Sequence, residues 1–187
     1  VEGYAKLAKA AGALVVVDGV CSIAGETLPM DEWGVDVAFT ASQKAIGVPP
    51  GLALVVANQK AMHTFKERKS PVPNYYADWA NWLPIMEAYQ SRKPAYFGTP
   101  AVNLIWALHK SLKIILAEGM EARVARHVKI ANAFQAAIAA LGLGQVPAKP
   151  EYAAHTLTAP RYPDGITGAN LLPAIKQSGV ITAGGLH

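Results

Sequence analysis

Val15-Val16-Val17-Asp18-Gly19 is the stretch of sequence that decides the fold. A continuous apolar run of β-branched residues, without polar alternation, is typical of a parallel strand that is covered on both faces. A helix is expected just before it over Tyr4–Ala11, and Gly12 supplies the stop signal. A helix that leads into a buried strand favours the α/β class, in which ligands bind at the carboxyl ends of the strands.

Two further strands are expected, over Val35–Thr40 and Leu52–Ala57. The first of them runs into the polar residues Ser42-Gln43-Lys44, and Pro49-Pro50-Gly51 forms a turn before the second. The sequence therefore predicts an α/β sheet, mostly parallel, with polar side chains at the ends of its strands.

The second half of the chain has a different texture. Residues Ser70–Thr99 are rich in prolines and aromatic residues, and we expect an irregular connection there with one short helix. A second, smaller α/β unit is expected to begin near residue 120, so the sequence predicts a larger domain over 1–117 and a smaller, incomplete one over 118–187. The expected elements are helices over Trp79–Tyr89, Pro100–Leu116, Glu118–Leu141 and Gly168–Gln177, and strands over Ala154–Ala159 and Val180–Thr182.

Composition excludes several classes of protein. The chain has 187 residues, 52% of them hydrophobic and 16% charged, which is too apolar for an intrinsically disordered chain. Its single cysteine excludes a disulfide framework and favours an intracellular protein, cytoplasmic by default, with a peroxisome or mitochondrion left open. The basic residues behind the +4 net charge are scattered, and no apolar run is long enough for a membrane span, so neither nucleic acid nor membrane is expected as a partner.

Asp18 and Lys44 carry the most informative chemistry. Each follows an apolar strand, so in a parallel sheet both side chains emerge at the same edge. A lysine amine can hold the aldehyde of pyridoxal phosphate, and an acidic residue can keep its pyridine nitrogen protonated. From the spacing alone, a capping aspartate with a surface lysine, or a plain ion pair, is favoured over a cofactor site. The five histidines show no close ligand spacing, so no metal site is expected.

Several motifs together resemble the class V aminotransferases, and within them the alanine-glyoxylate and serine-pyruvate aminotransferase group. The similarity runs over essentially the whole chain, and the motifs occur in the expected order. The stretches that carry it are Val16–Ser22, Asp31–Val37, Ala41–Ala45, Pro49–Gly51 and Tyr96–Leu104.

The resemblance implies the second half of the large domain of a fold-type I pyridoxal-phosphate enzyme, with part of the small C-terminal α/β domain. Lys44 matches the lysine that holds the cofactor, and Asp18 matches the partner of the pyridine nitrogen. Gln43 matches a residue that hydrogen-bonds the cofactor beside the lysine. The Ser42 hydroxyl either lies near the phosphate or bonds to backbone at the strand end.

Two further residues are implied by the same resemblance. Tyr96 and Thr99 match residues that reach the cofactor phosphate of the neighbouring subunit, which implies a homodimer. Between them, Phe97 and Gly98 depart from the paired histidines of some relatives.

The implied activity is a transaminase that moves an amino group from alanine or serine to glyoxylate or pyruvate by a ping-pong mechanism. Cysteine desulfurases are the nearest rival, but they carry a histidine immediately before the lysine, where this chain has Gln43. A non-catalytic subunit that keeps the fold is a second alternative, and a simple α/β domain in which Asp18 pairs with Lys44 is a third.

The resemblance also predicts that the sequence is a portion of a longer protein, lacking both ends of it. The match begins partway through the large domain and stops inside the small one. The N-terminal cofactor loops and the arginine that binds the substrate carboxylate would then lie outside this sequence, so we expect the segment alone to be inactive.

Overall fold

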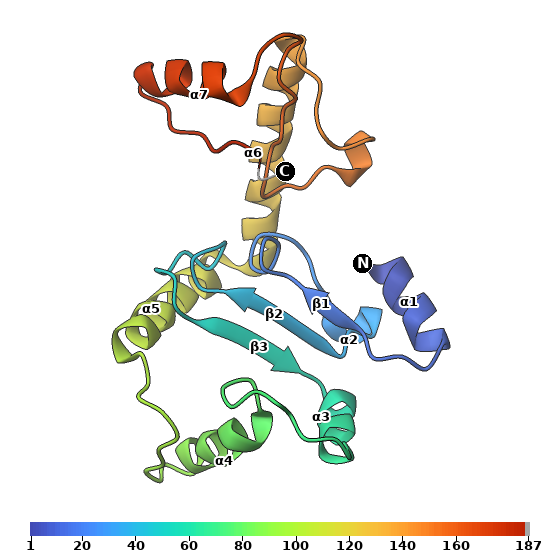
Figure 1. The fold of residues 1–187 in the computed structure, drawn as a ribbon, viewed down its shortest axis with the longest axis vertical. Coiled ribbons are helices and arrows are strands. Elements are labelled where there is room, and N and C mark those ends of the chain that lie inside the picture. Colours follow the sequence, from blue (N-terminus) through green and yellow to red (C-terminus); the bar gives the residue numbers. More distant parts are fainter. Residues whose placement is uncertain (186–187) are drawn as a thin grey trace. The chain divides into compact units, whose positions relative to one another are not determined.

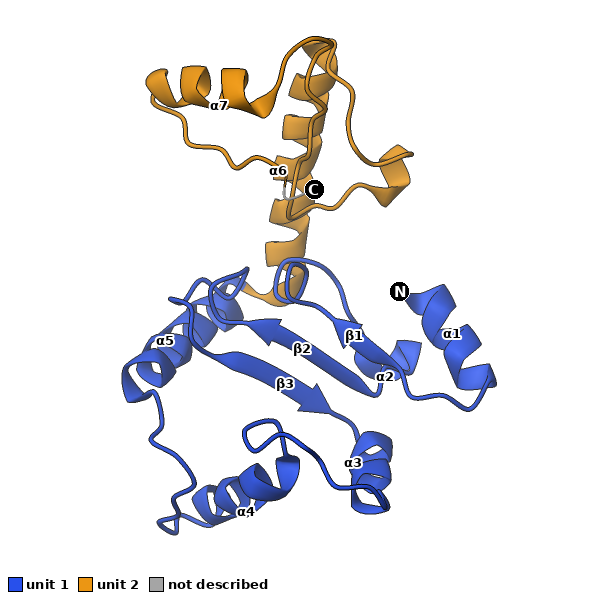
Figure 2. Ribbon diagram, viewed as in Figure 1, with its two compact units in different colours: residues 1–118 blue, residues 119–187 orange. Residues whose placement is uncertain are grey.

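The computed structural model describes residues 1–185 of the protein. The chain divides into two compact units, Val1–Glu118 and Gly119–His187 (Figure 2). The assignment of these units to a large and a small domain stays a prediction. None of the helices within residues 1–185 is both long enough and apolar enough to span a membrane.

The first unit is built on a three-stranded sheet in the order β1-β2-β3, formed by Val16–Asp18, Val37–Ala41 and Ala53–Ala57 (Figure 1). Strands β1 and β2 run parallel, as predicted, with Val17 opposite Ala38. Strand β3 runs antiparallel to β2, so the sheet is mixed and not mostly parallel. The connection from Ser42 to Leu52 is too short for the crossover that a parallel partner needs.

Five helices accompany the sheet in this unit. Two of them, α2 and α3, were not predicted, because a helix of one or two turns gives little periodic signal. The other three were predicted at nearly the observed bounds. The helices are α1 (Glu2–Ala10), α2 (Met30–Trp33), α3 (Gln59–Lys66), α4 (Trp79–Gln90) and α5 (Val102–Glu118).

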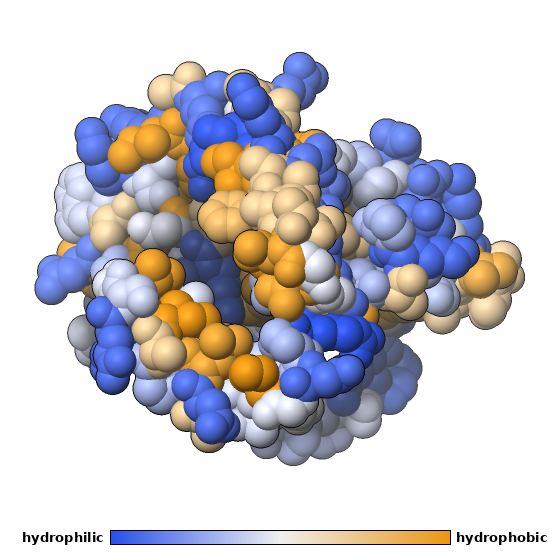
Figure 3. Space-filling view, turned by 90° about the horizontal axis from the view of Figure 1, so that it is seen from above, coloured by the Kyte–Doolittle hydropathy of each residue, from blue (hydrophilic) through white to orange (hydrophobic). Residues whose placement is uncertain are grey.

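The expectation that the strands are covered on both faces is wrong for the described chain. Val15 is buried, and it packs with Ala5 of α1 and with Val35 and Ala38. However, Val16 is 59% exposed, and Val55 on β3, which lies on the same face of the sheet as Val16, is 50% exposed. One face of the sheet is therefore packed and the other is largely open. Figure 3 shows hydrophobic residues (orange) between hydrophilic ones on the face that it draws.

The buried carboxylate of Asp36 holds the start of the sheet together. Its Oδ2 atom accepts a hydrogen bond of 2.8 Å from the Val15 N–H, and its Oδ1 atom accepts one of 3.0 Å from the Asn58 side-chain amide. The Lys60 ammonium lies 3.5 Å away. Asn58 also caps α3, since its side-chain oxygen accepts from the Ala61 N–H at 2.9 Å. One side chain thus ties β1, β2 and α3 to each other.

These contacts decide the pKa of Asp36. Burial of the carboxyl group works to raise its pKa, but the hydrogen bonds from Val15 and Asn58 and the charge of Lys60 outweigh it. The pKa therefore lies below its ordinary value. A carboxylate of this kind contributes stability above the pKa of the unfolded chain, about 3.9, and loses it as the pH falls through the folded value.

The second unit contains α6 (Met120–Ala140), the short 3-10 helix η1 (Pro150–Tyr152) and α7 (Gly168–Gln177). The strands predicted over Ala154–Ala159 and Val180–Thr182 do not form within residues 1–185. A single antiparallel bridge joins Gln145 to Pro160 instead. Two backbone hydrogen bonds flank this bridge, from the Val146 N–H to the Ala159 carbonyl at 2.9 Å and from the Arg161 N–H to the Gly144 carbonyl at 2.7 Å.

We expect Asp36→Asn to lower the free energy of unfolding by about 2 to 4 kcal/mol at pH 7. The new amide would face the Asn58 amide, donor against donor, and would no longer attract Lys60. Urea denaturation at several pH values measures the effect. Because the carboxylate contributes only while it is ionised, the difference from the parent protein should shrink below about pH 4.

Asp31→Asn is the matched control, since Asp31 is exposed on α2. Equal stability of the two variants at pH 7 would contradict the role given to Asp36.

Candidate active site

Asp18 is the last residue of β1 and lies opposite Phe39 of β2. The Gly19 N–H donates to the Phe39 carbonyl at 2.9 Å, which extends the parallel ladder past the end of the strand. The chain then turns sharply, and Asp18 Oδ1 accepts a hydrogen bond of 2.9 Å from the Val20 N–H. Its carboxylate is exposed at the carboxyl edge of the sheet.

Lys44 lies in the loop that leaves β2 at the same edge. Two turn hydrogen bonds shape this loop: the Lys44 N–H donates to the Ala41 carbonyl at 3.3 Å, and the Gly47 N–H donates to the Lys44 carbonyl at 2.9 Å. Gly47 has a φ of +75°, a conformation that favours glycine. The side chains of Gln43 and Lys44 are both exposed.

Apolar packing brings the two loops together. Ala24, from the loop after Asp18, is buried in one cluster with Ile46 and Val48, from the loop of Lys44. Ile115 of α5 completes the buried part of this cluster, and Ile23 packs against both it and the core beside α1. The loops that carry Asp18 and Lys44 are therefore held against the same helix and against each other.

Two hydroxyl groups fix the backbone of the Lys44 loop. Ser42 is fully buried, and its Oγ donates to the Pro49 carbonyl at 2.7 Å and accepts from the Leu52 N–H at 3.2 Å. Ser111 of α5 donates to the Ile46 carbonyl. Of the two positions left open for Ser42, the structure shows the hydroxyl bonded to backbone. A contact of Ser42 with a phosphate stays a prediction.

The simple pairing of Asp18 with Lys44 is not observed. Among residues 1–185, no ion pair joins them, and Lys44 Nζ has no hydrogen-bond partner. Asp18 uses one carboxylate oxygen in its turn, and Oδ2 has no partner in the described chain. An amine and a carboxylate oxygen, both accessible at one sheet edge, are the donor set that an aldehyde and a protonated pyridine nitrogen require. The residues present fit pyridoxal phosphate.

Tyr96 and Thr99 form a hydroxyl pair in the segment between α4 and α5. Tyr96 Oη and Thr99 Oγ1 lie 2.8 Å apart, and Tyr96 is 72% exposed. The structure therefore joins these two predicted residues by one hydrogen bond between their hydroxyl groups. Their contact with a cofactor phosphate stays a prediction.

Sequence reasoning missed the residues that hold the site in place. Ile46 and Ile115 carry no chemical signal, and Ser111 lies on a helix far from Lys44 in sequence. No group of three or more His, Cys, Asp or Glu side chains that suits a metal ion occurs in the part of the chain that the structure describes, and His187 lies outside that part.

Comparisons with known proteins point to one family. The model of the family described as aminotransferase class-V matches residues 1–187. An alanine-glyoxylate aminotransferase of Saccharomyces cerevisiae is 41% identical over 92% of this chain and 45% of its own length. A serine-glyoxylate aminotransferase of Arabidopsis thaliana is 38% identical over 86% of this chain and 38% of its own length. The chain thus spans less than half the length of these curated relatives.

A solved structure agrees with the sequence relatives. The crystal structure of an alanine-glyoxylate aminotransferase from a Nostoc species matches with a TM-score of 0.87 and 30% identity, over 99% of this chain and 48% of that one. The α/β fold expected from the sequence, that of a fold-type I enzyme, is thereby confirmed.

We expect Ser42→Ala to lower the free energy of unfolding by about 1 to 3 kcal/mol, because it removes the shared hydrogen-bond partner of the Pro49 carbonyl and the Leu52 N–H. Denaturation in urea measures the loss. Ser70→Ala, at an exposed position, is the control and should change the stability little. A stable Ser42→Ala protein with weakened cofactor binding would instead place the hydroxyl at the phosphate.

Proposed function

This chain belongs to the aminotransferase class-V family, and on that premise we propose that it supplies the cofactor-binding lysine and carboxylate of a transaminase. Family membership implies pyridoxal phosphate as the cofactor. The observation that carries the proposal is the placement of Asp18 at the end of β1 and of Lys44 in the loop after the adjacent parallel strand β2, where the loops that follow the two strands pack together at one sheet edge.

The roles of the two side chains follow from their chemistry. When bound, pyridoxal phosphate supplies an aldehyde and an electron-accepting ring. Lys44 Nζ would hold the cofactor at rest and, once freed by an amino acid substrate, would move the proton of the substrate α-carbon. Asp18 Oδ2 would accept a hydrogen bond from the protonated ring nitrogen, while Oδ1 keeps accepting from the Val20 N–H, which holds the carboxylate in place.

We propose glyoxylate or pyruvate as the amino acceptor and alanine or serine as the donor. The three proteins named above are all called glyoxylate aminotransferases, with alanine or serine as the donor. Substrate exchange through one site would then follow ping-pong kinetics. An intracellular location, expected from the single cysteine, also stays a proposal.

We expect Lys44→Ala, made in the full-length protein, to reduce transamination by at least about a hundredfold, since it removes both the covalent link and the base. Borohydride reduction of the parent protein should fix the cofactor to a peptide that contains Lys44. Lys110→Ala, at an exposed lysine of α5, should keep full activity.

Unchanged turnover in Lys44→Ala would exclude the proposed role. A parent protein that binds no pyridoxal phosphate would support the non-catalytic subunit instead.

We further propose a homodimer in which Tyr96 and Thr99 reach the phosphate of the neighbouring subunit. In a two-fold dimer, each site would then take Lys44 from one chain and Thr99 from the other. Co-expression of Lys44→Ala with Thr99→Ala chains should restore about a quarter of the native sites by random pairing, although each variant alone is weak.

Steady-state turnover and the stoichiometry of reducible cofactor measure this complementation. Activity of the mixture no higher than the mean of the two variants would refute the cross-subunit site.

A further inference from the structure

Four aromatic side chains form a cluster next to the Tyr96–Thr99 hydroxyl pair. This aromatic cluster consists of Tyr75, Tyr76, Trp82 and Phe97. The ring of Phe97 contacts all three others, with centroids 5.0 Å from Tyr75, 5.8 Å from Tyr76 and 4.8 Å from Trp82. The Trp82 contact is edge to face, the arrangement that aromatic pairs prefer.

One hydrogen bond ties the same segment to α4 directly before Tyr96, and Tyr76 lies against it directly after Phe97. Tyr89, on α4, donates from its hydroxyl to the Ala95 carbonyl at 2.9 Å. Trp82 donates from Nε1 to the Tyr76 carbonyl at 2.7 Å, which fixes the loop that carries Tyr76. A Cβ atom on Gly98 would lie only 3.2 Å from the Tyr76 hydroxyl, so that side chain lies close against the Gly98 backbone.

The segment thus presents successive side chains to different surroundings. Phe97 is half-buried in the cluster, whereas Tyr96 is 72% exposed and meets Thr99 through its hydroxyl. Anchoring of Ala95, Phe97 and Gly98 limits the backbone positions from which the Tyr96 and Thr99 side chains start, and so limits where their hydroxyls can lie.

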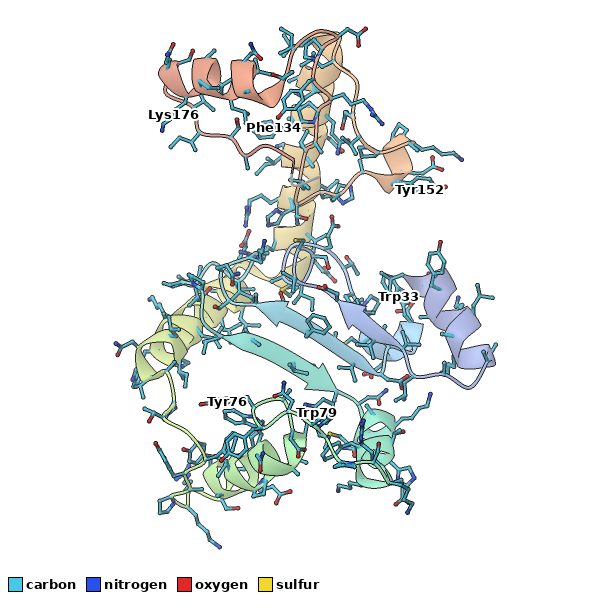
Figure 4. The ribbon with its side chains drawn as sticks, viewed as in Figure 1. Trp33, Tyr76, Trp79, Phe134, Tyr152 and Lys176 are labelled. Carbon is cyan, nitrogen blue, oxygen red and sulfur yellow. The ribbon has the colours of Figure 1, made fainter. Side chains whose placement is uncertain are left out.

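The cluster adds little to the core of the unit. Tyr75 and Tyr76 are 67% and 65% exposed, and none of the four residues belongs to either buried cluster beside the sheet. Phe65 and Trp79 form a separate aromatic pair, with centroids 5.5 Å apart, that involves the same helix α4. Figure 4 labels Trp79, the first residue of α4, and Tyr76, which lies beside this helix.

We propose that the aromatic cluster is a positioning device that holds the Tyr96 and Thr99 hydroxyls for the cofactor phosphate. This proposal rests on the function proposed above. Trp82 and Phe97 act through Tyr96 and Thr99 and do not touch the phosphate themselves. Phe97 and Gly98 then have a reason to replace the histidines of some relatives: the ring anchors the segment and the glycine admits the Tyr76 hydroxyl.

The test compares Trp82→Leu with Trp79→Leu in the full-length protein. For each variant, the dissociation constants of pyridoxal phosphate and of pyridoxal, which lacks the phosphate, are measured by spectroscopic titration. The ratio of the dissociation constant of pyridoxal to that of pyridoxal phosphate reports the phosphate contacts alone. It falls when those contacts are lost. We expect Trp82→Leu to lower this ratio by about tenfold, the loss of one hydrogen bond to a charged group, and Trp79→Leu to leave it within about twofold.

Trp82→Phe keeps a ring against Phe97 and should restore most of the ratio. Similar falls in Trp82→Leu and Trp79→Leu would show a general loss of structure and would overturn the positioning role, as would an unchanged ratio in Trp82→Leu.

Direct removal of the hydroxyls distinguishes the positioning role of the aromatic cluster from the proposed contact of Tyr96 and Thr99 with the phosphate. Tyr96→Phe and Thr99→Ala should each lower the ratio. If these two variants lower the ratio and Trp82→Leu leaves it unchanged, only the positioning role fails. If Tyr96→Phe and Thr99→Ala leave the ratio unchanged, the proposed phosphate contact is wrong, and the positioning role fails with it.

Discussion

The parallel pairing of β1 with β2 is the constraint on which the rest of the first unit depends, and the buried Asp36 carboxylate fixes it. A slip of one residue would turn every side chain of β1 to the opposite face. Asp36 opposes such a slip because it accepts the Val15 N–H and the Asn58 amide at the same time. With the register set at the amino edge of the strands, Asp18 comes to lie opposite Phe39 at the carboxyl edge.

At that carboxyl edge, apolar contacts complete what the strands begin. The loop after Asp18 and the loop of Lys44 share a buried cluster with α5, and Ser42 and Ser111 tie the second loop by its backbone. The polar groups at the edge therefore rest on a rigid support while their own side chains stay accessible. This division suits a site in which one amine and one carboxylate oxygen must meet the same ligand from fixed positions.

Much of this arrangement could be predicted from the sequence. The run Val15–Val17 and the polar residues after each strand indicated a shared edge, and the motifs indicated the family. Local pattern failed where an element depends on a partner. The strand expected over Ala154–Ala159 does not form, and the one bridge nearby joins Pro160 to Gln145. The short helix α3 depends on its cap Asn58, which also serves Asp36.

By itself, the sequence determined which chemical groups are available and roughly where along the chain they fall, since strand ends follow from hydrophobic pattern and turn residues. Only the tertiary structure decided what those groups touch. It bonded Ser42 to backbone, joined the Tyr96 and Thr99 hydroxyls, and gathered Tyr75, Tyr76, Trp82 and Phe97 beside them. The physical reason is that a hydrogen bond or a ring contact needs side chains at a set distance and angle. Those depend on the backbone path of irregular segments and on the packing of other elements against them, and a hydrophobic pattern encodes neither.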